Sequence, residues 1–206
     1  MPKKKIEHIA IIPARKNSVG FPKKNRIFFS YTYNFLNKIK WFDKIYISTD
    51  DDWFKKYSRK RKYEFIKRSK KLSGHKISIK RVMEDAVKKK EINSKTIIWL
   101  IYIPLIPKSK KLFEKTKKII ESKNVKSICG FTKVKTHPFL SWYTKKNKLY
   151  QYCKNDIYRR QDLPTALTHN HVVCAFKRNE LKKLNNELIN SNTKPIIINS
   201  EIKEID

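Results

Sequence analysis

Short apolar runs rich in isoleucine alternate with longer amphipathic segments along most of this chain. Runs with the composition of β-strands occupy residues 8–12, 44–48, 63–67, 96–103, 127–132, 172–176 and 195–198. Segments with helical spacing of apolar residues occupy residues 31–40, 53–62, 79–90, 109–122 and 179–189. Because strands that alternate with helices are typical of βαβ units, the sequence predicts an α/β fold: a mostly parallel sheet flanked by helices.

The segment from about residue 137 to 170 breaks this alternation. It is rich in aromatic and polar residues and has neither a helical nor a strand period. A chain of 206 residues is long enough for one domain with a full core. We therefore expect a single domain over residues 1–206, with an excursion at about 137–170 that serves as an oligomer contact.

A basic loop follows the first expected strand. Residues 15–25 hold one arginine, three lysines, one serine, two asparagines and one glycine. Ligands of open parallel sheets bind beyond the carboxyl ends of the strands, where backbone N–H groups and cations can hold a triphosphate. Gly20, one of three glycines in the chain, suggests a turn with positive φ or a close approach to a ligand. Asp50 ends the second strand at the same edge and either serves this site or caps the next helix.

The charge of the chain permits a second interpretation. Fifty lysines and arginines against 18 aspartates and glutamates give a formal net charge of +32, which is typical of proteins that bind polyanions. The lysines are spread over the whole chain, and Ile, Asn, Lys, Tyr and Phe are frequent, as an AT-rich genome would produce. We favour that compositional explanation and do not expect a nucleic-acid partner. The aromatic residues among the lysines of 53–63 are expected to face the core.

Cysteine and histidine usage does not by itself predict a metal site. Cys129, Cys153 and Cys174 are widely spaced and form no CxxC pair, so we expect reduced thiols in a cytoplasmic protein. His169 and His171 form an H-x-H pair with no evident third ligand. The N-terminus does not resemble a signal peptide. The longest apolar run, residues 97–106, contains a proline and is too short to span a bilayer, so no membrane partner is expected.

Several motifs, in order along the chain, resemble those of the CMP-sialic acid synthetases, or acylneuraminate cytidylyltransferases. The first loop is similar to the pattern A-R-x-x-S-K-G-x-x-x-K-N, and residues 47–50 are similar to V-S-T-D. Residues 159–164 read R-R-Q-D-L-P, as in the family, and the chain end at 204–206 resembles D-I-D. Weaker matches are Arg68 with Leu72, Pro104-Leu105, His137-Pro138, and Asn170 with residues 172–176.

The resemblance implies a Rossmann-like nucleotidyltransferase and a reaction. The anomeric hydroxyl of an acidic nonulosonic sugar attacks the α-phosphate of CTP, giving the CMP-sugar and pyrophosphate. Such a transfer depends mostly on positioning and charge neutralisation. The resemblance also implies a homodimer in which the sugar site draws on the excursion. It assigns catalysis to Arg15 and Lys24, nucleotide binding to Ala14, Ser18, Gly20, Asn25 and Arg68, sugar binding to Arg160 and Gln161, and Mg²⁺ (or Mn²⁺) to Glu204 and Asp206.

Some positions depart from the family pattern. Val19 replaces a lysine of the first loop, Ile106 and Thr168 replace arginines, and residues 100–103 are apolar where the family is polar. The nucleotide half of the site is thus better preserved than the sugar half. Three outcomes stay open: a cytidylyltransferase for a different acidic sugar, a poor enzyme, or a degenerate homologue that only binds a nucleotide or another polyanion.

Overall fold

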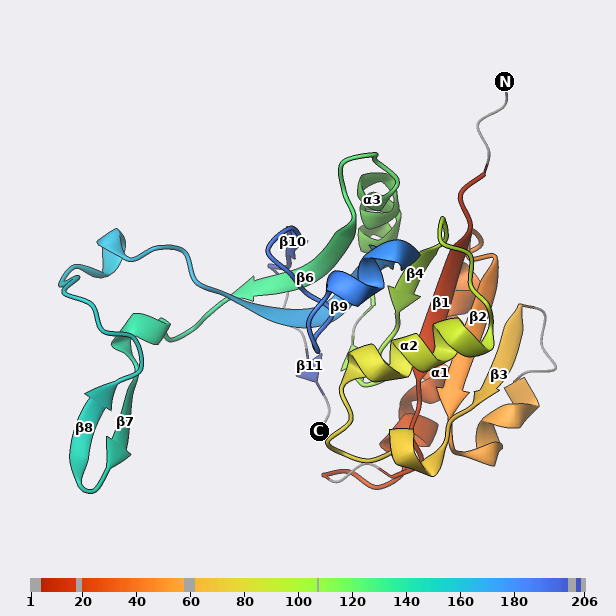
Figure 1. The fold of residues 1–206 in the computed structure, drawn as a ribbon, viewed down its shortest axis with the longest axis horizontal. Coiled ribbons are helices and arrows are strands. Elements are labelled where there is room, and N and C mark those ends of the chain that lie inside the picture. The colour runs from red at the N-terminus through yellow and green to blue at the C-terminus, as the bar shows by residue number, and fades with distance from the viewer. Residues whose placement is uncertain (1–4, 18–19, 58–61, 107, 200–202, 205–206) are drawn as a thin grey trace.

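The computed structural model describes residues 5–17, 20–57, 62–106, 108–199 and 203–204, the last two by their backbone only (Figure 1). Its strands are β1 (His8–Pro13), β2 (Lys44–Thr49), β3 (Tyr63–Lys67), β4 (Ile97–Leu100), β5 (Leu105–Ile106), β6 (Ser127–Lys133), β7 (Trp142–Lys145), β8 (Lys148–Gln151), β9 (Leu167–Lys177), β10 (Lys194–Ile197) and β11 (Lys203–Glu204). Its α-helices are α1 (Lys24–Lys38), α2 (Ile79–Lys89) and α3 (Lys110–Ile120), and its 3-10 helices are η1 (Asp52–Tyr57), η2 (Lys70–Leu72), η3 (Pro138–Leu140), η4 (Arg160–Asp162) and η5 (Arg178–Lys183).

A seven-stranded sheet of order β10-β6-β9-β4-β1-β2-β3 forms the centre of the molecule. β9 is antiparallel to both of its neighbours, and the other adjacent strands are parallel. The predicted mostly parallel α/β sheet is confirmed. Because β1, β2, β3 and β4 are parallel, their carboxyl ends meet at one edge of the sheet.

Apolar side chains cover both faces of this sheet. One face packs against α1, η1 and α3, with Phe29, Phe54 and Phe113 fully buried there. The other face packs against α2 and η5, with Met83, Ala86 and Leu181 buried there. No helix in the described part of the chain has the length and apolarity needed to cross a bilayer.

The first helix differs most from its expected bounds. The structure begins α1 at Lys24, seven residues before the expected start at residue 31. Asn25, Phe29, Thr32 and Leu36 are all buried on the face that packs against the sheet, at helical spacing. The basic loop therefore ends in the first turn of a helix rather than in open loop.

Two expected helices are short 3-10 helices instead. Of the segment expected at 53–62, residues 53–57 lie in η1 and residues 58–61 lie outside the described residues; the segment expected at 179–189 forms η5 over its first part. In η1, Phe54 and Tyr57 contact Phe29 edge-on at 5.0 and 4.6 Å between ring centroids, so packing holds this segment without a full α-helix. The expectation that the aromatic residues of this segment face the core is confirmed for Phe54, which is fully buried.

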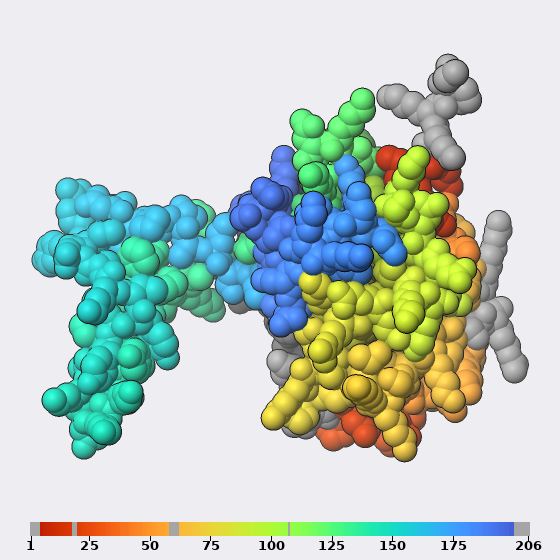
Figure 2. Space-filling view, viewed as in Figure 1, coloured from red at the N-terminus to blue at the C-terminus, as the bar shows by residue number. Residues whose placement is uncertain are grey.

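Residues between β6 and β9 project away from the sheet as a separate arm (Figures 1 and 2). Within it β7 and β8 form an antiparallel hairpin whose turn residues, Lys146 and Asn147, have φ of 48° and 60°. Positive φ at both turn residues matches the twist of a two-residue hairpin. β9 begins at Leu167, before the expected residue 172, because it still pairs with Lys133 of β6 there.

Candidate functional site

A pocket of about 270 Å³ lies at the carboxyl ends of β1, β3 and β4. Its walls come from the loop after β1, the first turn of α1, the segment after β3 and the segment after β4. The lining residues are Pro13, Arg15, Lys24, Asn25, Arg68, Leu72, Gly74, His75, Ile77, Ile79, Val82, Tyr102 and Pro104. The structure thus brings together four of the residues predicted from sequence, namely Arg15, Lys24, Asn25 and Arg68.

The positive charge of this pocket comes from side chains and from the backbone. Arg15 follows β1, and Lys24 is the first residue of α1. The N-terminus of a helix carries a partial positive charge and unpaired N–H groups, both of which favour anions. With Arg68, three cationic side chains and a helix N-terminus lie at one pocket, and together they form a suitable site for a phosphate chain.

Arg68 is held rigidly at the wall of the pocket. Its guanidinium donates to the Ser48 carbonyl oxygen at 2.6 Å and to Ser48 Oγ at 3.3 Å, and its backbone N–H donates to the carbonyl of Thr49 at 2.8 Å. The residue is only 5% exposed, and burial lowers the pKa of Arg68 to about 10. It therefore stays charged at neutral pH while two of its donors remain fixed on β2.

The loop after β1 is fastened from both sides. Asn25 Nδ2 donates to the carbonyl oxygen of Arg15 at 2.9 Å, and the backbone N–H of Lys16 donates to Asp50 Oδ1 at 2.7 Å. Ala14 is fully buried, and its N–H donates to the Ser48 carbonyl at 2.9 Å. Asn25, Asp50 and Ala14 thus hold the backbone from which Arg15 projects.

An ion pair beside the loop was not predicted from the sequence. Arg26 Nε and one of its terminal nitrogens donate to the two carboxylate oxygens of Asp51 at 2.6 and 2.7 Å. Asp51 Oδ1 also accepts from the backbone N–H of Trp53 at 3.1 Å, so Asp51 rather than Asp50 caps η1. Burial alone would raise the pKa of Asp51, but the bonds from Arg26 and Trp53 lower it below its ordinary value. The only signal in the sequence was the position of Asp51 after a strand.

The apolar segment after β4 serves the core more than the pocket. Leu100, Ile101 and Ile103 are at most 1% exposed, and only Tyr102 of this segment lines the pocket. The replacement of the polar family residues at 100–103 therefore changes one side chain of the pocket wall. Tyr102 and His75, which also lines the pocket, were not among the predicted site residues.

Other predicted residues lie elsewhere. Gly20 does not have positive φ. Among the described residues of this loop, Lys23 has the left-handed conformation, at φ 59°. Ser18, Val19 and Asp206 lie outside the described residues. The backbone of Glu204, in β11, pairs with Leu105 of β5, next to Pro104 of the pocket.

Arg160 and Gln161 are both exposed in η4, at the far end of the arm from the pocket (Figure 1). Arg160 lines a second pocket of about 380 Å³, to which Lys133, Lys135 and His137 also contribute. The two pockets share no lining residue. His137 accepts from the N–H of Phe139 through Nδ1, so its Nε2, 2.8 Å from the Pro164 carbonyl, carries the proton and donates. These two bonds give His137 a structural role within the arm.

The family model for cytidylyltransferases matches residues 9–197 of this chain. The chain belongs to the cytidylyltransferase family. Among curated proteins it is similar to N-acylneuraminate cytidylyltransferases of Streptococcus agalactiae. The serotype III protein is 26% identical over 165 residues, or 75% of this chain, and the serotype V protein is 27% identical over 166 residues. The chain spans about 40% of the length of these relatives.

Solved structures of other cytidylyltransferases share the fold of this family member. A CMP:2-keto-3-deoxy-manno-octonic acid synthetase complexed with CTP superposes with a TM-score of 0.58 at 13% identity, covering 86% of this chain and 76% of that chain. The 4-diphosphocytidyl-2C-methyl-D-erythritol synthase of Anaerococcus prevotii gives a TM-score of 0.60 at 14% identity, covering 93% and 87%. At such low identity these likenesses establish the Rossmann-like nucleotidyltransferase fold and nothing finer.

Proposed function

We propose that this chain transfers CMP from CTP to an acidic sugar of the nonulosonic class and releases pyrophosphate. The observation that carries the proposal is the pocket in which Arg15, Lys24, Asn25 and Arg68 converge beyond the strand ends of a cytidylyltransferase fold. The curated relatives are named for N-acylneuraminate, which supports a sialic-acid-like substrate.

The residues of the pocket have distinct tasks in this reaction. The anomeric oxygen of the sugar forms a bond to the α-phosphorus, the bond from that phosphorus to the bridging oxygen breaks to release pyrophosphate, and the hydroxyl proton passes to water. Arg15 and Lys24 neutralise the phosphate oxygens and the departing pyrophosphate. Arg68, fixed by Ser48, and Asn25, which holds the loop, orient the nucleotide so that the reacting atoms stay in line.

A divalent cation, Mg²⁺ or Mn²⁺, is part of the proposal, with Glu204 and Asp206 as its expected ligands. The pairing of β11 with β5 supports this assignment, because it brings the backbone of Glu204 beside the pocket. Such an ion prefers carboxylate oxygens and supplies charge neutralisation to phosphate oxygens.

The activity is tested with the purified chain, Mg²⁺, each of the four ribonucleoside triphosphates and a panel of acidic nonulosonic sugars. We expect pyrophosphate release with CTP and at least one sugar, and we expect Arg15→Ala to lower turnover by about 100-fold or more, as loss of one charge-stabilising donor does. Lys16→Ala is the matched control, because it removes the same charge from the adjacent, exposed residue. Equal losses in the two variants, or no release from CTP with any sugar, would overturn the assignment. Binding of all polyanions alike, weakening with salt, would then identify the degenerate homologue.

We further propose that a second copy of the chain completes the sugar half of the site through the arm. Exposed aromatic and aliphatic side chains cover the arm, and they include Trp142, Leu149, Tyr152 and Tyr158. Arg160 does not line the pocket of its own chain, and the arm that carries it projects away from the sheet (Figure 1). A surface of this kind is typical of an oligomer interface.

Mixing two inactive variants tests whether the site is shared. Arg15→Ala removes the nucleotide half, and Arg160→Ala removes the sugar half of the neighbouring site. Co-refolded mixtures are expected to regain up to about a quarter of the native activity by random pairing of the two chains. A monomeric mass in light scattering, or mixtures no more active than either variant alone, would exclude a shared site.

A further inference from the structure

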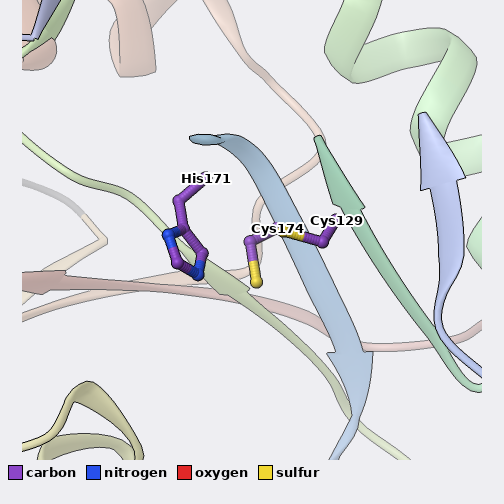
Figure 3. A group of neighbouring side chains, drawn as sticks. All are labelled: Cys129, His171 and Cys174. Carbon is purple, nitrogen blue, oxygen red and sulfur yellow. The ribbon is translucent and has the colours of Figure 1, made fainter. Parts of the chain in front are cut away.

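Two cysteines and one histidine, far apart in the sequence, meet inside the molecule (Figure 3). Cys129 of β6 pairs directly with Cys174 of β9, and the two residues are 0% and 1% exposed. His171 is 7% exposed, and its ring lies beside the side chain of Cys174 (Figure 3). One ligand atom from each of the three side chains lies within 4.8 Å of the other two.

An irregularity in β9 places His171 on the same face as the thiols. Cys174 packs on the α2 face of the sheet and its neighbour Val173 packs on the opposite face, as strand alternation requires. Continued alternation would turn His171 to the Val173 side. Instead His171 adopts φ 49° and its ring contacts Tyr102 on the α2 face. A non-glycine residue held in the left-handed region is strained, and such strain is concentrated at functional sites.

The partner strand accommodates this irregularity with a glycine. Cys129 pairs with Cys174, and Phe131 pairs with His169. Between these two pairs β6 advances by two residues and β9 by five, so β9 contains extra, unpaired residues. A Cβ on the intervening Gly130 would lie 2.5 Å from Asn170 Oδ1, so this position accepts no larger residue without movement. The bulge is therefore built into both strands.

A second group of polar side chains lies at the surface, next to the cluster of Cys129, His171 and Cys174. His169 and Glu187, both exposed, lie 3.6 Å apart, and their ligand atoms are also within 4.8 Å of His171. His171 Nε2 lies 2.8 Å from the carbonyl oxygen of Glu187, which fixes the orientation of its ring. A metal-bound histidine is commonly oriented by such a bond from its other ring nitrogen, so an ion would bind Nδ1 here unless it displaces the Glu187 carbonyl from Nε2.

We propose that Cys129, His171 and Cys174 bind a thiophilic d¹⁰ cation of the Zn²⁺ class. Two thiolates and an imidazole match the ligands that such ions prefer, and a water molecule or a side chain of the outer pair can take a fourth position. Each thiol releases its proton when it binds the ion. A disulfide between the two cysteines would not involve His171. A metal site would explain why the backbone of β9 turns His171 to the same face of the sheet as the two thiols.

The cluster is separate from the nucleotide pocket but borders it. None of its residues lines the pocket, while the ring of His171 lies edge-on to Tyr102, which does, with 5.6 Å between centroids. An ion at the cluster would therefore immobilise a residue behind the pocket wall. The proposal does not depend on the cytidylyltransferase activity.

The full chain, purified under reducing conditions, provides the test. After dialysis against micromolar Zn²⁺, we expect one zinc per chain by plasma mass spectrometry. Titration of the metal-free chain with Co²⁺ should give thiolate charge-transfer absorption and the intense visible bands of a tetrahedral site. We expect Cys174→Ser and His171→Asn to weaken binding by at least the roughly 10- to 100-fold that even outer-shell changes cost. Cys153→Ser is the matched control, because Cys153 lies on the arm outside the cluster.

Three results would overturn the proposal. One is a native chain that retains no zinc and gives no charge-transfer band with Co²⁺. Another is His171→Asn that binds as tightly as Cys153→Ser, with both variants folded by circular dichroism. The third is a Cys129–Cys174 disulfide in the chain isolated under reducing conditions, which mass spectrometry detects as a loss of two hydrogens.

Discussion

Replacement of Asp51 by alanine is expected to destabilise the region that holds the first loop. The carboxylate accepts two hydrogen bonds from Arg26 and one from the backbone of Trp53, while its side chain is only 3% exposed. Arg26 lies in the first turn of α1, next to Asn25 of the pocket. The pair therefore ties α1 to the junction of β2 and η1.

The magnitude follows from what the substitution leaves behind. Hydrogen bonds to charged groups contribute about 1.5–3 kcal/mol each, and breaking a fully buried ion pair costs about 3–5 kcal/mol. Arg26 is 30% exposed, so water can replace part of what it loses. The N–H of Trp53 also loses its side-chain acceptor. We expect Asp51→Ala to lower the free energy of unfolding by about 2–4 kcal/mol.

Urea unfolding followed by circular dichroism measures this loss. With a slope of about 2 kcal/mol per molar, the midpoint should fall by about 1–2 M. Asp52→Ala is the matched control, since Asp52 is the adjacent residue, its side chain is 71% exposed and it pairs with the exposed Lys55. That variant should unfold like the native chain. If the two variants shift the midpoint equally, the reasoning that the buried pair organises this region is wrong.

Two further predictions concern the core. His8 is buried with its Nδ1 accepting from Trp99 Nε1 at 3.1 Å, and burial lowers its pKa below 6.5. As the pH falls, His8 therefore binds a proton in the unfolded chain before it does so in the folded chain. The contribution of neutral His8 to stability is complete above pH 6.5 and is lost as the pH drops toward the lower pKa of the folded state. Between pH 7 and pH 5, the urea midpoint should fall less steeply in His8→Gln than in the native chain. Gly130→Ala should cost about 1–3 kcal/mol, because its Cβ would meet Asn170. Gly74→Ala, with its nearest atom at 3.7 Å, should be nearly neutral in the same assay.

The strands were largely predictable because each carries its own periodic signal. The run expected at 63–67 coincides with β3, and the run expected at 44–48 differs from β2 by one residue. Helix bounds were harder to predict, because packing decides them. The start of α1 depends on the burial of Asn25 and Phe29 against the sheet. The packing of η1 depends on contacts with Phe29 of α1, which precedes Phe54 by 25 residues.

The convergence of four motif residues at one pocket was predictable from their register, whereas sites assembled across strands were not. Arg15, Lys24, Asn25 and Arg68 were found because strand ends of a parallel sheet converge. Cys129 and Cys174 gave no signal, since only the pairing of β6 with β9 brings them together. His171 was noted as half of an H-x-H pair, but the left-handed backbone that turns it inward has no mark in the sequence.

The separation of the two pockets gives the apolar departures at residues 100–103 a different meaning. Three of those four side chains fill the core behind the pocket. Apolar residues at these positions therefore do not change the part of the pocket that Arg15, Lys24 and Arg68 line. The arm, by contrast, carries its basic pocket away from the sheet and buries little of its own apolar surface. If the chain acts as proposed and a neighbouring chain supplies that arm, the arm and Tyr102 select the sugar, while Arg15, Lys24 and Arg68 hold the nucleotide.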